Sequence, residues 1–281
     1  MTKRKPVTAQ EAHEIRPGQS LELLKELHIL TREGRMNQDS RRKLKQVYHL
    51  YQFIEPLLAE IDHPDIRLVD HGAGKSYLGF ILYDLFFKAR ADASRVYGIE
   101  SRAELVAKSR DLAERLNFPG MSFHPLSVAE ATVSDQLPDE VDVVTALHAC
   151  DTASDDAISF ALKKRARFIV LVPCCQAEVA AVLRRNKAAA SAAGALSELW
   201  RHPLHTREFG SHVTNVLRCL QLEAHGYQVS VTELVGWEHS LKNELIVASY
   251  RDLPRRRPGE RLSELLATLG LTELERRFCP P

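Results

Sequence analysis

The sequence predicts an α/β fold: a mostly parallel sheet that ends in an antiparallel hairpin and follows a helical extension. Three observations support this prediction. Short β-branched, apolar runs alternate with helical segments from residue 65 onward. A glycine-rich turn joins the first of these runs to a helix. Near the end of the chain, residues 227–235 and 244–250 have the pattern of two paired strands with no helical segment between them.

Helices are expected before residue 62. Residues 20–27 have a helical apolar rhythm, with Ser20 placed as the N-cap and Leu23 in the first turn. Residues 43–61 carry apolar side chains at helical spacing, which gives this segment one face to bury. We therefore expect an N-terminal helical extension over residues 1–61.

Strands and helices alternate from residue 65 to residue 172. The strands are continuous β-branched runs bounded by polar turns, which is typical of a parallel sheet buried on both faces. Two of them end at the acidic residues Asp70 and Glu100, and three more cover residues 121–124, 141–147 and 168–172. Helices are expected between strands at residues 102–116 and 151–164.

The pattern is helical again after the fifth strand, at residues 186–199 and 208–225, and Gly226 is expected to end the second of these helices. Pro254 and Pro258 flank an arginine-rich segment that we interpret as a linker, with a helix following over residues 260–269. The predicted domains are a helical extension or cap, a main α/β domain, and a basic linker with a C-terminal helix, at residues 1–61, 62–252 and 253–281.

Composition indicates a soluble globular protein. The 281 residues carry a formal net charge of +1, which argues against a uniformly basic nucleic-acid binder, although basic clusters occur at residues 3–5, 41–45 and 255–257. No signal peptide opens the chain, and its longest apolar stretch is too short to span a bilayer. The five cysteines, with Cys174 and Cys175 adjacent, do not form an ordinary disulfide framework. We expect a cytoplasmic protein with no membrane association and no disulfide-linked partner.

The turn after the first strand predicts a nucleotide-type ligand site. Gly72 and Gly74 let the backbone pass close beneath a ligand, and the helix that follows directs free N–H groups at it. Residues 74–76 match the end of a phosphate-binding loop, but Val69 stands where that motif needs a glycine. A dinucleotide-binding turn would need a third glycine at Tyr77. Neither of these two templates fits well.

A second acidic residue favours a ligand that contains ribose. Glu100 closes the strand that precedes it, one strand after Asp70. A carboxylate at this place can accept hydrogen bonds from both ribose hydroxyls, whereas a triphosphate site has no use for it. The alternative is that Glu100 is only a solvated strand end. Because Asp70 and the two glycines accompany it, we interpret Glu100 as a ribose-binding acid.

Residues 70–74 and 96–100 resemble the first two motifs of the class I S-adenosylmethionine (SAM) methyltransferases, which have a Rossmann-like sheet. Further segments resemble one subgroup of that class, at residues 70–75, 147–153, 172–175, 207–212 and 239–244. The subgroup includes the methyltransferase domain of the glutathione S-transferase C-terminal domain-containing protein and, more distantly, the tRNA 2′-O-methyltransferases. The resemblance covers roughly residues 43–250 and identifies residues 62–252 as a SAM-binding methyltransferase domain.

The resemblance implies SAM as the cofactor and assigns roles to several residues. Asp70, Gly72, Gly74 and Tyr77 would hold the methionine end, and Glu100 would hold the ribose. The adenine edge would lie against Ser127 and Val128. The full expected cofactor-binding set is Asp70, Gly72, Ala73, Gly74, Lys75, Tyr77, Leu78, Glu100, Ser101, Ser127, Val128, Leu147 and His148.

Two departures from the family pattern stand out. The glycine that usually follows the lysine is Ser76 here, which we interpret as a helix cap. No aspartate follows the third strand, so adenine recognition would depend on the Ser127 hydroxyl and on backbone groups. Lys75 either neutralises a carboxylate or is solvated.

The loop after the fourth strand faces the methyl group in this fold, which places His148, Cys150 and Asp151 nearest the chemistry. His148 can accept a proton from a hydroxyl or a ring nitrogen near neutral pH, or its ring only packs beside the cofactor. RNA cytosine-C5 methyltransferases carry cysteines after the fourth and fifth strands, and Cys150 with Cys174 or Cys175 occupy comparable places. Buried thiols alternatively behave as small hydrophobic groups.

A metal site is not expected. Potential ligand atoms are present at His148, Cys150, Cys174, Cys175 and His212, but their spacing matches no standard zinc pattern. The Asn/Asp-Pro-Pro-aromatic loop of amino-group methyltransferases is absent from the sequence, which argues against an exocyclic amine as the methyl acceptor.

The function predicted from these residues is SAM-dependent methyl transfer to RNA, with tRNA as one candidate acceptor. Three alternatives stay open. The acceptor is a protein or a small molecule, the chain is a non-catalytic binding module that keeps the fold, or it is a nucleotide-binding protein of the phosphate-loop type.

Overall fold

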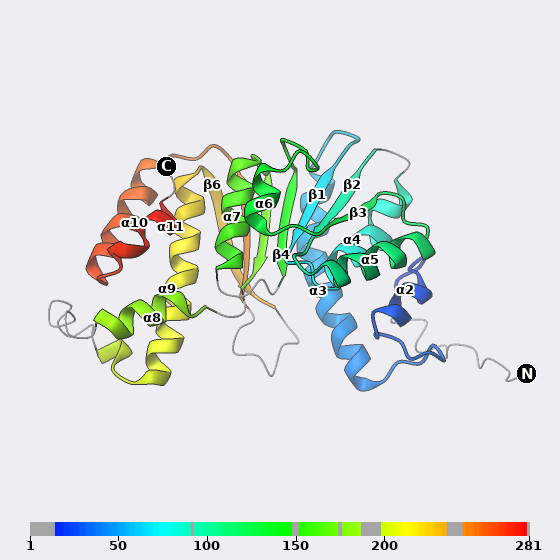
Figure 1. The fold of residues 1–281 in the computed structure, drawn as a ribbon, viewed down its shortest axis with the longest axis horizontal. Coiled ribbons are helices and arrows are strands. Elements are labelled where there is room, and N and C mark those ends of the chain that lie inside the picture. The colour runs from blue at the N-terminus through cyan, green and yellow to red at the C-terminus, as the bar shows by residue number, and fades with distance from the viewer. Residues whose placement is uncertain are drawn as a thin grey trace, which may run out of the picture. The chain divides into compact units, whose positions relative to one another are not determined.

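A computed structural model of the protein describes residues 15–90, 93–147, 152–173, 176–186, 198–234 and 244–279 (Figure 1). The chain divides into two compact units. The first unit comprises residues 1–127 and 234–241, and the second comprises residues 128–233 and 242–281. The domain boundaries expected from the sequence stay a prediction.

The first unit begins with two helices. In α2 (Leu21–Glu26), the Ser20 hydroxyl oxygen accepts a hydrogen bond from the Leu23 N–H at 3.2 Å, so the predicted N-cap is confirmed. Helix α3 (Gln38–Ala59) begins five residues earlier than predicted, because the Asn37 side chain caps it by accepting from the Ser40 N–H at 2.8 Å. The apolar face of α3 is buried through Leu44, Leu50, Ile54 and Leu58.

Three parallel strands follow, in the spatial order β3-β2-β1. They are β1 (Arg67–His71), β2 (Arg95–Ile99) and β3 (Met121–His124), and between them run α4 (Tyr77–Leu85), a 3-10 turn at Phe87–Ala89 and α5 (Ala103–Arg115). Asp70 pairs with Gly98, and His71 pairs with Ile99. Because of this register, the chain leaves β1 and β2 at the same edge of the sheet, where the two predicted acids lie.

The second unit contains the other four strands, in the order β4-β5-β7-β6. Strands β4 (Val143–Leu147) and β5 (Phe168–Val172) are parallel, whereas β7 (Glu244–Tyr250) runs antiparallel to both β5 and β6 (Tyr227–Glu233). The predicted fold class, a mostly parallel Rossmann-like sheet with a terminal antiparallel pair and a helical N-terminal region, is confirmed.

The helices of the second unit are α6 (Val128–Val133), α7 (Ala153–Lys163), α8 (Glu178–Arg185), α9 (Pro203–Ala224), α10 (Arg256–Thr268) and α11 (Glu275–Phe278), with a 3-10 turn at Thr272–Leu274. An apolar cluster joins α8, α9, α10 and α11 and includes Leu183, Leu217, Leu266 and Phe278. Helices α8 and α9 approach each other closely at Gly210, where a Cβ would lie 2.8 Å from the Ala180 backbone.

Two predicted elements of this unit need correction. Helix α9 begins at Pro203, five residues before the predicted start, because proline fits the first turn of a helix, where its missing N–H has no intrahelical partner. For the same reason Pro258 lies within the first turn of α10, so Arg256 and Arg257 belong to that helix and not to a linker. Gly226 follows α9 with a φ of 90°, as predicted. Most of the helix predicted at residues 186–199 lies outside the described residues.

No helix in the described part of the chain has both the length and the apolar character that crossing a membrane requires.

Candidate cofactor site

In the loop between β1 and α4, three of five consecutive residues have a left-handed backbone conformation. Gly72, Gly74 and Ser76 have φ values of 62°, 56° and 51°. Glycine adopts this conformation without a steric penalty, whereas serine does not. The Ala73 N–H donates to the Ile99 carbonyl at 3.0 Å, which ties the loop to the end of β2. The loop therefore presents its backbone at the carboxyl edge of the two strands.

Glu100 reaches this loop directly. Its Oε2 accepts from the Gly74 N–H at 2.9 Å and from Arg102 Nη2 at 3.2 Å, while its Oε1 accepts from Arg102 Nε at 2.9 Å and from the Arg102 backbone N–H at 3.0 Å. The Arg102 guanidinium lowers the pKa of Glu100 to about 2, so the carboxylate is charged at neutral pH. The structure thus joins the predicted ribose-binding acid to the predicted glycine loop.

Asp70 lies beneath the loop and is only 1% exposed. The Ser76 hydroxyl donates to its Oδ2 at 3.4 Å. Ser76 is the N-cap residue of α4, as predicted, but its side chain makes no capping hydrogen bond. A capping side chain needs extended backbone at the N-cap, and the positive φ of Ser76 turns its hydroxyl toward Asp70 instead.

His71 is fully buried at the end of β1. Burial lowers the pKa of its imidazole to about 3, so the ring is neutral at physiological pH. No pattern in the sequence singled out this side chain.

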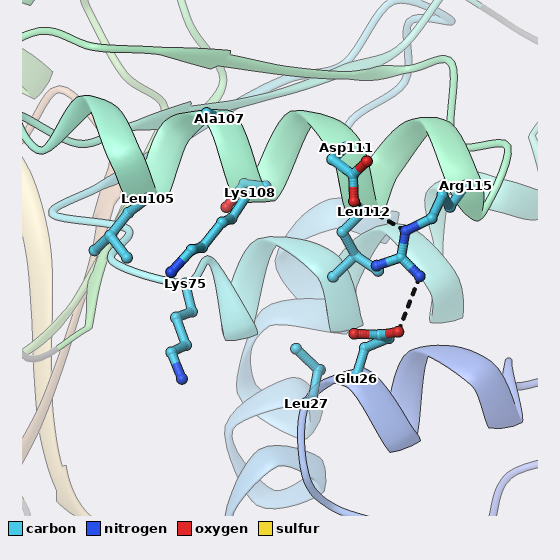
Figure 2. Close-up of a pocket in the computed structure, with 10 residues that line it drawn as sticks. Glu26, Leu27, Lys75, Leu105, Ala107, Lys108, Asp111, Leu112 and Arg115 are labelled. Atoms are coloured by element: carbon cyan, nitrogen blue, oxygen red, sulfur yellow. Dashed lines mark hydrogen bonds and ion pairs between the residues drawn. The ribbon is translucent and has the colours of Figure 1, made fainter. Parts of the chain in front are cut away.

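The remaining residues of the expected cofactor set differ in exposure. Tyr77 is half-buried at the start of α4, and the Leu78 side chain is buried in the core, so only the backbone of Leu78 is available to a ligand. Lys75 and Ser101 are exposed. Figure 2 shows the side chain of Lys75 extending from the loop on the side of α5 and α2. Ser127 ends the first unit, whereas Val128 and Leu147 belong to the second.

The residues of the first unit fit an adenosyl amino acid. The loop supplies backbone groups from two glycines, and Glu100 supplies a charged acceptor for hydroxyl groups. The Arg102 side chain, which holds that acceptor, is 60% exposed and so can move without disturbing the core.

The residues expected to carry the chemistry, His148, Cys150, Asp151, Cys174 and Cys175, lie outside the described residues. His212 is exposed on α9. Among the described residues there is no cluster of three or more His, Cys, Asp or Glu side chains that could hold a metal ion.

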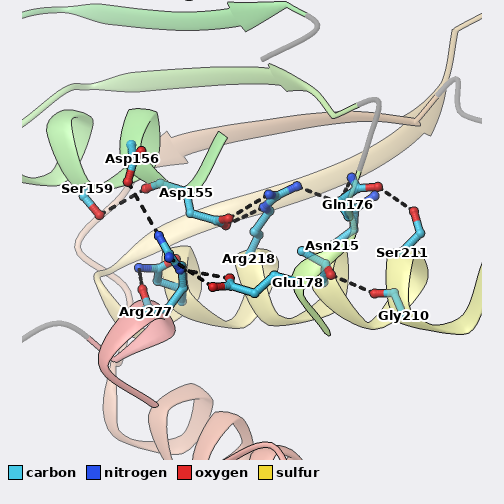
Figure 3. A network of polar contacts seen from close by, with 12 residues as sticks. Asp155, Asp156, Ser159, Gln176, Glu178, Gly210, Ser211, Asn215, Arg218 and Arg277 are labelled. Carbon is cyan, nitrogen blue, oxygen red and sulfur yellow. Dashed lines mark hydrogen bonds and ion pairs between the residues drawn. The ribbon is translucent and has the colours of Figure 1, made fainter. Parts of the chain in front are cut away.

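A buried polar network in the second unit was not predicted (Figure 3). Asp155 of α7 accepts from Arg218 Nε at 2.6 Å and from its Nη2 at 2.9 Å, and both side chains are almost fully buried. Arg218 Nη1 donates to Asn215 Oδ1 at 3.2 Å, and Asn215 Nδ2 donates to Glu244 at 2.7 Å. Gln176 donates to the same Asn215 oxygen at 3.0 Å. Helix α9 is thereby joined to α7, to the segment after β5 and to the start of β7.

Sequence reasoning missed both arginines of these sites. Arg102 had a local signal, because it stands two residues after the predicted acid and therefore within reach of it. Arg218 had a weaker signal, since it interrupts the buried face of α9 between Thr214 and Leu222 at helical spacing. A charge on such a face indicates a buried partner, but the sequence does not say that the partner is Asp155.

Comparison with known structures gave matches of low identity with TM-scores below 0.5. Magnesium protoporphyrin IX methyltransferase from Synechocystis PCC 6803, crystallised with bound SAH, has a TM-score of 0.45 and 15% identity over 82% of this chain and 93% of that chain. An rRNA methylase from Streptococcus thermophilus has a TM-score of 0.45 and 9% identity over 73% of this chain and 96% of that chain. Fibrillarin from Methanococcus jannaschii, a pre-rRNA processing protein, has a TM-score of 0.42 and 14% identity over 68% of this chain and 70% of that chain.

Comparison with curated proteins gave no match. Residues 42–182, just over half of the chain, match a protein family described as "Methyltransferase domain". The match contains the glycine loop, Glu100 and the first five strands. The chain belongs to this family and is a class I SAM-dependent methyltransferase, with S-adenosylmethionine as its cofactor.

Proposed function

We propose that the protein transfers the methyl group of SAM to RNA, and that the glycine loop and Glu100 hold the cofactor. The observation that carries the cofactor assignment is the 2.9 Å hydrogen bond from the Gly74 N–H to the Glu100 carboxylate. This bond supports the proposal because it joins a charged hydrogen-bond acceptor to the backbone of the glycine loop. Asp70, Gly72, Gly74 and Tyr77 are assigned to the methionine end, and the adenine edge is assigned to Ser127 and Val128.

Ribose binding requires an exchange of partners at Glu100. The two hydroxyls of the ribose would donate to the oxygens that now accept from Arg102 Nε and Nη2. Because the Arg102 side chain is mostly exposed, the ion pair that it leaves contributes little to stability. The bonds from the Gly74 and Arg102 backbone N–H groups can stay in place during this exchange.

SAM supplies the methyl group as a sulfonium, and the protein must align the acceptor and remove its proton. We assign proton removal from a hydroxyl or ring nitrogen to His148. We place Asp151, which follows the same strand, near the reacting atoms as well. The alternative to His148 is a cysteine pair, Cys150 with Cys174 or Cys175. In that case a thiolate adds to a pyrimidine ring before methylation and leaves the ring afterwards.

The RNA acceptor is supported by the resemblance to the subgroup that includes tRNA 2′-O-methyltransferases and by the basic cluster on α3. Lys43 and Lys45 of that cluster are exposed and have no partner among the described residues. Arg255 and Arg256 support it less, because they pair with Asp252 and Glu260. A cytoplasmic location is part of the proposal, and the free thiols of Cys219 and Cys279 are consistent with it.

Two measurements test the proposal. A thermal-shift panel of SAM, S-adenosylhomocysteine, NAD and ATP with magnesium should show stabilisation by the first two compounds alone. Transfer of a labelled methyl group to pools of total RNA, protein and metabolites should label RNA. Stabilisation by ATP alone would favour a phosphate loop, and no response to any compound would favour a non-catalytic module. Label in protein or metabolites would move the acceptor to that class.

A further inference from the structure

We propose that a pocket between α2 and α5 binds one nucleotide of a single-stranded RNA acceptor, with Lys75 and Lys108 as its phosphate-binding groups. This inference rests on the proposed function, since it specifies where the first unit would hold the RNA. The pocket has a volume of about 480 Å³. Its lining includes Leu27, Lys75, Leu105, Lys108, Leu112 and Arg115.

Three separate segments build this pocket (Figure 2). Leu105, Lys108, Leu112 and Arg115 lie at intervals of three and four residues, so they share one face of α5. Leu27, the C-cap residue of α2, lies opposite that face. Lys75 comes from the glycine loop, directly after Gly74. The pocket therefore adjoins the candidate cofactor site through the loop.

The charges around the pocket favour an anion. Arg115 is occupied, because its Nη1 pairs with Glu26 at 2.9 Å and its Nε pairs with Asp111 at 2.9 Å. The same guanidinium lowers the pKa of Glu26. Lys75 and Lys108 have no partner among the described residues, and Figure 2 shows both on the same side of α5. Three basic and two acidic side chains therefore line the pocket, which leaves one net positive charge for a ligand.

The floor of the pocket favours a ligand that also has an apolar face. Leu27 and Leu112 are buried and Leu105 is half-buried. A nucleotide has this combination, with a phosphate for the lysines and a base whose face can pack on the leucines. The volume lies within the range of about 300–1,000 Å³ that is usual for small-ligand pockets. A base paired in a duplex cannot enter such a pocket, so the RNA must be single-stranded there or extrude the nucleotide.

Lysine suits the phosphate role, because its ammonium group acts as a compact point charge on a flexible stem. Each phosphate contact also adds to the salt dependence of binding, since counterions leave the RNA when a lysine replaces them. The inference therefore predicts two losses when a lysine is removed, one of affinity and one of salt dependence.

The experiment compares Lys75→Ala, Lys108→Ala and Lys163→Ala. Lys163 is the control, because it is an exposed lysine at the end of α7 in the second unit and also has no partner among the described residues. Fluorescence anisotropy with a labelled single-stranded oligoribonucleotide would be measured at about 50 mM and about 200 mM salt. Competition with AMP and with inorganic phosphate would be measured in parallel.

Lys75→Ala and Lys108→Ala should each weaken RNA binding by about fivefold or more and reduce the salt slope by about 0.7, whereas Lys163→Ala should change neither. AMP should compete better than inorganic phosphate. Lys108→Ala should keep the affinity of the wild type for SAM, because Lys108 is not part of the cofactor set, and this shows that the fold is intact.

Equal RNA binding by all three variants, in a protein that still transfers label to RNA, would overturn the pocket and leave the proposed function standing. Absence of RNA binding by the wild type, with label in another pool, would overturn both. Equal competition by AMP and phosphate would overturn the nucleotide pocket in favour of a bare anion site. Lysine-dependent AMP binding that RNA does not displace would overturn the RNA assignment in favour of a small metabolite.

Discussion

Replacing Glu100 by alanine should weaken SAM binding by about 30- to 150-fold. The carboxylate now accepts two hydrogen bonds from the Arg102 side chain, and the ribose hydroxyls would take over these two positions. A hydrogen bond to a charged group contributes about 1.5–3 kcal/mol. Because the ribose displaces an existing ion pair, we expect a net loss of about 2–3 kcal/mol, which corresponds to the stated change in affinity.

Isothermal titration calorimetry with SAM and with S-adenosylhomocysteine measures this loss. Glu104→Ala is the matched control, because Glu104 is an exposed acid in the first turn of α5. Glu100→Gln should fall between the wild type and the alanine variant, since the amide keeps one acceptor oxygen. A thermal melt confirms that Glu100→Ala is folded. If the folded variant binds SAM within about twofold of the wild type, the ribose assignment is wrong.

Three further predictions test the local structure. Arg102→Ala should raise the pKa of Glu100 from about 2 toward 4.5. As the pH is lowered from about 6 to about 4, the SAM affinity of the variant, measured by calorimetry, should therefore fall, whereas that of the wild type should stay constant. Ser76→Gly should have a free energy of unfolding about 1 kcal/mol higher than Ser76→Ala in chemical denaturation, because both variants lose the hydroxyl bond to Asp70 and only glycine relieves the left-handed backbone. A glycine variant no more stable than the alanine variant would contradict the positive φ. Arg218→Leu should lower the free energy of unfolding, measured by chemical denaturation, by about 3–5 kcal/mol, because it leaves Asp155 buried and unpaired. Adding Asp155→Ala to this variant should restore part of the loss. If the losses of the two single variants simply add in the double variant, the pairing is contradicted.

The strands could be predicted closely from the sequence. β3 and β5 have the predicted bounds, because each is a short apolar run between polar turns. The pairing of β6 with β7 could be predicted because the sequence shows no helical pattern between the two runs. Helix starts were predicted less well. The first turn of α3 is polar, and that of α9 begins with proline, so neither shows the apolar periodicity from which a helix is recognised.

The candidate site could be predicted in its residue types but not in its contacts. The spacing of the strands was enough to bring Glu100 to the glycine loop. It did not show that Arg102 holds the carboxylate, because that contact depends on how the chain turns after β2. The pairing of Asp155 with Arg218 spans 63 residues and has no local pattern.

The two acids of the candidate site also shape the loop that they flank. Asp70, from β1, accepts from the Ser76 hydroxyl, and Glu100, which follows β2, accepts from the Gly74 N–H. A loop held from both strands before the cofactor arrives loses less conformational freedom when the cofactor binds. The Gly74 amide should therefore exchange slowly with solvent deuterium in the absence of SAM. Exchange at this amide, followed by NMR, should become fast in Glu100→Ala and stay slow in Glu104→Ala. Fast exchange in the wild type without SAM would mean that the loop is ordered by the ligand and not by Glu100.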